Sequence, residues 1–157
     1  MRRGDIMSEK LIAKIGDTVA IASDHAGVKY KSILSKCLEE LGFEVLDLGT
    51  CDEASVDYPD YGHAVANAVA GNRASAGVAI CGTGIGISIA ANRHKGVRAA
   101  LVHDAFTAKM SRQHNNANIL ALGARSVSED TARGILKAFF STQFEGGRHE
   151  RRIEKID

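Results

Sequence analysis

Residues 77–92 have the sequence GVAICGTGIGISIAAN, and this stretch decides the fold class. Its first five residues form a brief apolar run, which predicts a buried strand over residues 77–81. Glycines at positions 82, 84 and 86 then favour a tight turn, and residues 85–92 are predicted to form a short helix. A strand that passes directly into a helix is the repeating unit of α/β folds.

Similar strand–helix units lie on both sides of this stretch. Further strands are predicted at residues 18–23, 44–48, 97–102 and 118–123. Helical patterns are found at residues 27–41, 58–72, 104–114, 126–140 and 148–157. The helix after the last strand is expected to begin at Ser126, because Ser126 and Glu129 have capping-box spacing. Five apolar strands, each followed by a helix, predict a three-layer, Rossmann-like α/β fold with a five-stranded parallel sheet.

Length and composition favour a single domain over residues 18–157, preceded by an N-terminal extension over residues 1–17. Twenty basic and nineteen acidic residues nearly cancel, so neither nucleic acid nor a membrane is expected as a partner. The three cysteines include no CxxC pair, which argues against a disulfide framework and against a structural zinc site. No apolar run follows the charged start of the chain, so we expect a cytoplasmic protein.

Chemically active side chains follow the predicted strands, where ligands bind in open parallel sheets. Asp24 and His25 follow the first strand, although Asp24 is equally suited to cap the next helix. The glycines at 82, 84 and 86 would let backbone N–H groups approach a phosphate or an enolate, or would simply form a tight turn. They do not fit a dinucleotide-binding GxGxxG motif, because the third glycine of that motif would fall at Ile87.

Cys81 stands out among the cysteines, because a thiol beside a helix N-terminus is readily converted to a nucleophilic thiolate. His114 lies at the end of a predicted helix, where a capping role is the alternative. Arg148 and Arg152 are four residues apart, which places both on one helix face and suits a phosphate, although salt bridges to nearby glutamates are the alternative. The histidines follow no metal-binding motif, so the sequence requires no metal.

Seven segments, taken together and in order, resemble the type B ribose-5-phosphate isomerases of the ribose/galactose-6-phosphate isomerase family. They are SDHAG (23–27), DYPDYG (57–62), CGTGIGISIAANR (81–93), GVRAAL (96–101), SRQHNNAN (111–118), LGAR (122–125) and EGGRHERR (145–152). The galactose-6-phosphate isomerase subunits of the wider family generally lack the RQHN segment and the GGRH tail. The resemblance is therefore to the pentose enzymes.

This resemblance implies an aldose–ketose isomerase that interconverts D-ribose 5-phosphate and D-ribulose 5-phosphate through a cis-enediolate, in the non-oxidative pentose phosphate pathway. The resemblance implies that the enzyme uses neither a cofactor nor a metal. It also implies a homodimer, or a pair of dimers, in which two subunits share each active site. Cys81 would be the general base, and His114 with Asp24 would open the furanose ring. The enediolate would be stabilised by Thr83 and by the N–H groups of Gly82, Gly84, Ile85 and Gly86. Sugar hydroxyls would be bound by Tyr58 and Asn115, and the phosphate by His25, Arg125, Arg148 and Arg152.

Two alternatives remain open from the sequence. The same catalytic set would serve a six-carbon sugar phosphate such as allose 6-phosphate, because the depth of the pocket decides the substrate. The second alternative is a sugar-phosphate-binding module without catalysis, since a fold does not guarantee activity. Such a module would have no reason to keep Cys81, Thr83 and His114 together.

Overall fold

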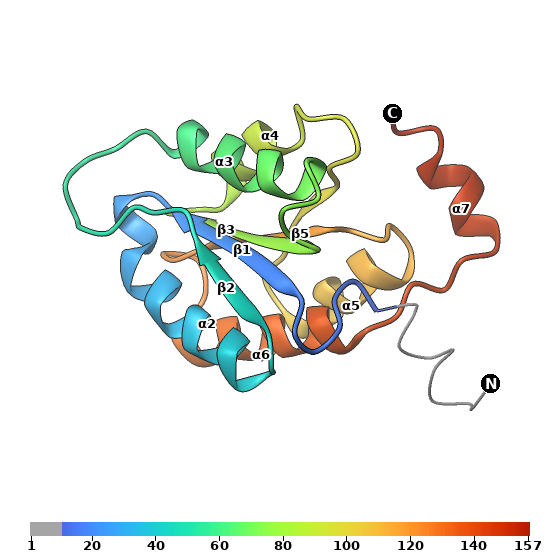
Figure 1. Cartoon of the computed structure of the whole chain (residues 1–157), viewed down its shortest axis with the longest axis horizontal. Coiled ribbons are helices and arrows are strands. Elements are labelled where there is room, and N and C mark those ends of the chain that lie inside the picture. The colour runs from blue at the N-terminus through green and yellow to red at the C-terminus, as the bar shows by residue number, and fades with distance from the viewer. Residues whose placement is uncertain (1–10) are drawn as a thin grey trace.

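A five-stranded parallel sheet forms the centre of the computed structural model, which describes residues 11–157 (Figure 1). The strand order across the sheet is β2-β1-β3-β5-β4. The strands are β1 (Thr18–Ser23), β2 (Glu44–Asp47), β3 (Ala76–Cys81), β4 (Ala99–Leu101) and β5 (Ile119–Gly123). The predicted α/β class and the five-stranded parallel sheet are therefore confirmed.

Helices cover both faces of this sheet and complete the three layers (Figure 1). One face carries α3 (Tyr58–Ala70) and α4 (Ile85–Ala91). The other face carries α2 (Val28–Glu40), α5 (Ala105–Gln113) and α6 (Glu129–Ser141). A short 3-10 helix, η1 (His25–Gly27), precedes α2, and α7 (Arg148–Ile153) lies apart from the sheet near the C-terminus. Within residues 11–157, no helix combines the length and the apolar character that crossing a membrane requires.

Alternating side chains divide the core into two clusters, because successive residues of a strand point to opposite faces of the sheet. In β1, Val19 and Ile21 pack toward α2 and α6, whereas Ala20 and Ala22 pack toward α3. The small side chains on the second face let α3 approach closely. A Cβ added at Gly77 would lie 2.3 Å from Val65 on that helix.

Several boundaries differ from the prediction by a few residues, among them the end of α7 at Ile153, and two of the differences have a local cause. Strand β4 has three residues rather than six. Before it, the Arg98 N–H donates to the Asn118 side chain at 2.8 Å, while the Arg98 carbonyl accepts from the Asn118 and Ile119 N–H groups. Helix α6 begins after Ser128, whose hydroxyl accepts a hydrogen bond from the Thr131 N–H at 3.1 Å, so the predicted start at Ser126 is wrong. The N–H of Ser126 instead closes a turn onto the Gly123 carbonyl.

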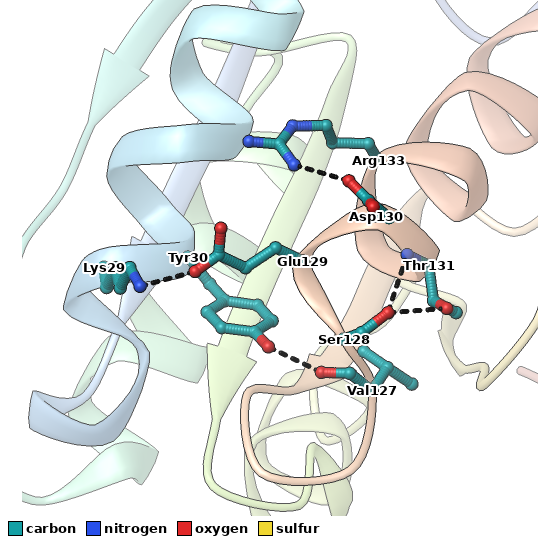
Figure 2. A network of polar contacts seen from close by, with 8 residues as sticks. All are labelled: Lys29, Tyr30, Val127, Ser128, Glu129, Asp130, Thr131 and Arg133. Carbon is teal, nitrogen blue, oxygen red and sulfur yellow. Dashed lines mark hydrogen bonds and ion pairs between the residues drawn. The ribbon is translucent and has the colours of Figure 1, made fainter.

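The loop between β5 and α6 is tied to α2 by polar contacts (Figure 2). The Tyr30 hydroxyl donates to the Val127 carbonyl at 2.6 Å, and Lys29 forms an ion pair with Glu129. The ion pair is largely exposed and adds little stability. The partly buried hydrogen bond of Tyr30 therefore contributes more to holding the loop against α2. This contact holds in place the loop over residues 124–128, which contains Arg125.

The first part of the predicted N-terminal extension, residues 1–10, lies outside the described residues. The second part, residues 11–17, packs against the domain. Ala13 is only 3% exposed and belongs to the core, and the Gly16 N–H donates to the Gly42 carbonyl at 2.8 Å. These residues therefore form part of the folded unit.

The connections place a topological switch point between β1 and β3. From β1 the chain moves outward to β2, and it then returns to the other side of β1 as β3. Helices α2 and α3, which make these two connections, cover opposite faces of the sheet. A crevice is therefore expected outside the carboxyl ends of β1 and β3, where Asp24 and Cys81 lie.

Candidate active site

The carboxyl end of β1 supplies Asp24 and His25. Asp24 is 6% exposed, and its Oδ1 accepts a hydrogen bond from the Ala26 N–H at 2.9 Å, so the capping role considered for this residue is present. His25 accepts a hydrogen bond on Nδ1 from the Val56 N–H at 3.2 Å. An imidazole that accepts on Nδ1 in its neutral form carries its proton on Nε2, which has no hydrogen-bond partner within residues 11–157 and can donate to an anionic group.

The carboxyl end of β3 supplies Cys81, which is 4% exposed. Its Sγ accepts a hydrogen bond from the Gly84 N–H at 3.1 Å. Gly84 can make this bond because its φ of 76° lies in the left-handed region, which glycine adopts without strain. The glycine turn therefore curls around the sulfur and fixes its position.

The N–H groups of this turn are divided between two uses. The Gly84 N–H is bound by Cys81, and the Ile85 N–H donates to the Thr83 hydroxyl at 3.2 Å. Among the described residues, the Gly82 and Gly86 N–H groups form no such bond with a side chain. Of the four predicted backbone donors, Gly82 and Gly86 are therefore the two that are open to a ligand.

Tyr58 and Arg125 lie on either side of the same turn. A Cβ added at Gly86 would lie 2.4 Å from the Tyr58 ring, and one added at Gly82 would lie 3.2 Å from the Arg125 guanidinium. The backbone of Arg125 is fixed by its N–H bond to the Gly82 carbonyl at 2.9 Å. The structure thus brings together one group of predicted residues around Cys81: Asp24, His25, Tyr58, Gly82, Thr83, Gly84, Ile85, Gly86 and Arg125.

The remaining predicted residues lie at the opposite edge of the sheet. Helix α5 begins after the carboxyl end of β4 and runs back to the amino end of β5, so His114, at its C-cap, lies near the strand starts. Asn115 follows it directly, and Arg148 and Arg152 lie on α7 nearby (Figure 1). The two edges are separated by the length of a five-residue strand, about 17 Å. His114 and Asp24 of one chain therefore do not meet.

Two arginines fix the loop that contains His114 and Asn115 by hydrogen bonds to its backbone. The sequence analysis did not single out either of them. Arg98 donates from Nε to the Asn115 carbonyl at 3.1 Å, and Arg112 donates to the Ala117 carbonyl at 2.6 Å. Arg112 is 1% exposed, and burial followed by the charge of Arg98 lowers its pKa to about 10. It still carries its charge at neutral pH, so the loop is fixed by charge-assisted hydrogen bonds.

His149 is a third residue that the sequence analysis missed. Its ring stacks on His114 with centroids 4.5 Å apart and an angle of 15° between the planes, and its Nε2 lies 3.5 Å from Glu145 Oε2. Burial lowers the pKa of His149 below 6.5, and the charges of His114 and Arg148 act in the same direction. The signal in the sequence was its place between two predicted phosphate ligands, but only the packing shows that it touches His114.

Comparison with known proteins decides the family. Residues 19–156 match the family described as Ribose/Galactose Isomerase. The chain belongs to this family. The match covers the five strands, apart from Thr18 at the start of β1, and every predicted site residue.

Individual members of the family agree closely with this chain. Ribose-5-phosphate isomerase B of Escherichia coli is 46% identical over 138 residues, which cover 88% of this chain and 93% of that protein. The solved structure of Clostridium thermocellum ribose-5-phosphate isomerase B superposes with a TM-score of 0.88 at 48% identity, covering 88% of this chain and 94% of the other. The type B ribose 5-phosphate isomerase of Trypanosoma brucei has the same TM-score at 42% identity, with coverages of 90% and 97%.

Proposed function

We propose that this protein interconverts D-ribose 5-phosphate and D-ribulose 5-phosphate through a cis-enediolate, as a step of the non-oxidative pentose phosphate pathway. Family membership makes it an aldose–ketose isomerase. The observation that carries the specific proposal is the position of Cys81, buried at the switch point and held by the Gly84 N–H.

Cys81 is the general base in this scheme. In the aldose-to-ketose direction, its thiolate removes the proton from C2, and the hydroxyl proton on O2 moves to O1 as the enediolate forms and collapses. The proton held by the sulfur then returns to C1, so no electrons leave the substrate and no redox cofactor is required. Negative charge develops on the oxygens, and Thr83 with the open N–H groups of Gly82 and Gly86 would stabilise it.

Ring opening precedes this step, because only the open-chain sugar has a carbonyl group. We assign it to His114, which would move a proton between the ring oxygen and the anomeric hydroxyl, with Asp24 as its polar partner. Tyr58 and Asn115 would bind sugar hydroxyls. The phosphate would be held by the Nε2–H of His25 together with Arg125, Arg148 and Arg152.

The separation of the two residue groups supports a homodimer, or a pair of dimers, with shared active sites. One sugar phosphate cannot contact Cys81 and His114 of the same chain across about 17 Å. A second copy that places its His114 edge against the Cys81 edge of the first would complete the site. Ile85 and Ile89 lie four residues apart on α4, beside the Cys81 turn, and are 53% and 60% exposed, which suits burial by a partner.

A proton transfer between adjacent carbons requires neither a metal nor a redox cofactor. We propose that the protein works in the cytoplasm on a small sugar phosphate, without a nucleic-acid or membrane partner. The proposed isomerase activity is tested by turnover on ribose 5-phosphate and allose 6-phosphate. The two sugars are measured side by side for wild type, Cys81→Ala and the control Cys51→Ala. Cys51 is exposed in the loop before α3 and has no assigned role.

We expect efficient conversion of the pentose by wild type and by Cys51→Ala. Cys81→Ala should be slower by about 10²- to 10⁴-fold, because it removes the general base. Preferred conversion of allose 6-phosphate would reassign the substrate to the six-carbon class. Failure of both sugars to react would favour the binding module and overturn the catalytic roles.

A further inference from the structure

Three potential metal ligands converge beside the C-terminal end of α5. They are His114, Glu145 and His149, and one ligand atom from each lies within 4.8 Å of the other two. The backbone holds them together, because the Glu145 N–H donates to the Gln113 carbonyl at 3.1 Å and the His149 N–H donates to the Gly146 carbonyl at 3.2 Å. The cluster therefore belongs to the folded chain and does not depend on a chance approach of surface side chains.

His149 is the fixed member of this cluster. It is 5% exposed, and neither of its ring nitrogens forms a hydrogen bond within residues 11–157, so Glu145 at 3.5 Å is its only polar contact there. Its nitrogens are not among the fully buried, unpartnered side-chain atoms of the described residues, so they can be reached from solvent. The ring of His149 therefore offers a lone pair that no group within residues 11–157 uses.

We propose that this cluster is a binding site for zinc ions, and that zinc bound there inhibits the enzyme. Two imidazoles and one carboxylate form a donor set that zinc accepts in enzymes, with a fourth position open to water. Tetrahedral ligands at about 2.1 Å from zinc are about 3.4 Å from one another. The rings of His114 and His149 are stacked with an angle of 15° between their planes, so binding one ion requires the His114 ring to turn out of this stack. His114 and Glu145 are not fully buried, which leaves room for that movement toward the fixed His149.

The chemistry also sets the selectivity and the strength of the site. Imidazole nitrogens favour zinc over magnesium and calcium, which prefer oxygen ligands. Arg148 and Arg152 both act electrostatically on His149, and their positive charges oppose a bound cation. Glu145 offsets only part of this repulsion, so the site is expected to be reversible rather than structural.

Inhibition follows from the role assigned to His114, and in this respect the inference rests on the proposed function. An imidazole nitrogen that is bound to zinc cannot accept or donate a proton, so ring opening stops while zinc is bound. Zinc binding itself does not depend on that role. The two parts can therefore be tested separately.

Binding is measured by isothermal titration of zinc chloride into the metal-free full-length protein, in a buffer that does not bind zinc. The Cys81→Ala background is used so that the reactive thiol does not compete for the metal. Within this background, His149→Gln and Glu145→Gln remove ligands. His63→Gln serves as the matched control, because His63 and His94 form another histidine pair, with ring nitrogens 2.7 Å apart and no carboxylate ligand assigned to it.

We expect one zinc ion per chain, binding at least about tenfold more weakly in His149→Gln and Glu145→Gln and unchanged in His63→Gln, with no heat from magnesium chloride. Zinc should also inhibit the enzyme with native Cys81, and EDTA should restore its activity. In His149→Gln, also with native Cys81, the zinc concentration needed for half inhibition should rise at least tenfold.

Absence of zinc binding, or equal binding by the background protein and its His149→Gln variant, would overturn the proposed site. Binding that is lost in His63→Gln would move the site to the other histidine pair and would equally overturn it. A protein that binds zinc at this cluster but isomerises neither sugar would leave the site standing and refute the proposed function instead.

Discussion

Gly84→Ala is the substitution for which the structure gives the sharpest expectation. Gly84 has a φ of 76°, and a Cβ added there would lie 2.5 Å from Leu101 Cδ1 and 2.7 Å from the Leu122 carbonyl carbon. The first contact can be relieved by a side-chain rotation, but the second is to the backbone of a central strand. Either the turn or β5 must move.

The cost has two separable parts. An alanine in the left-handed region costs about 1–2 kcal/mol, and forcing an extra methyl group into a packed site costs about 1–3 kcal/mol more. We therefore expect Gly84→Ala to lower the free energy of unfolding by about 2–5 kcal/mol. This is a large fraction of the stability of an ordinary domain, about 5–15 kcal/mol.

Two other glycines supply matched controls. Gly96 has a φ of 80° but no atom within 4 Å of an added Cβ, so Gly96→Ala should cost only the conformational part, about 1–2 kcal/mol. Gly134 lies within α6 with an ordinary φ and open space, so Gly134→Ala should stabilise by about 0.5–1 kcal/mol. Urea unfolding of all three variants, followed by circular dichroism, measures the differences. Equal losses for Gly84→Ala and Gly96→Ala would refute the steric part of the reasoning.

Three further predictions concern the site. Arg148→Ala should mainly raise KM for ribose 5-phosphate, because it removes a phosphate contact, and an unchanged KM in steady-state kinetics would remove Arg148 from the phosphate site. Because the pKa of His149 is lowered below 6.5 in the folded state, the unfolded chain binds its proton first as the pH falls. Wild type should therefore lose stability below about pH 6.5, and His149→Gln should lose less, in thermal melts at pH 7.5 and pH 5.5; equal losses would contradict this assignment. Prolonged treatment with EDTA should leave isomerase activity intact, since no step uses a metal, and a loss restored by added metal would force a different mechanism.

The strands and the strand-end chemistry could be predicted because they depend on local patterns. The apolar run 76–81 and the glycines after it determine a buried strand and a turn with little help from the rest of the chain. The start of α6 could not be settled in the same way. Ser126 and Ser128 both stand shortly before the helix, and the turn that binds the Ser126 N–H to Gly123 decides between them.

The division of the site into two groups could have been inferred from topology but not from motifs. A helix that follows a parallel strand runs back along the sheet, so a residue at its end, such as His114, returns to the edge where the strands begin. The stacking of His149 on His114 could not be predicted from the sequence. His149 lies on α7 and His114 directly follows α5, far apart in the chain, and the path of residues 142–147 brings them into contact.

Complementation between two inactive variants tests the central claim, which is a site that combines Cys81 of one chain with His114 of another. Cys81→Ala and His114→Ala proteins are each measured alone and then after co-expression, with ribose 5-phosphate as substrate. In a random mixture about half of the dimers are hybrids with one intact site, so activity should recover to about a quarter of the wild-type value. No recovery, with mixed dimers shown to be present, would contradict a shared active site.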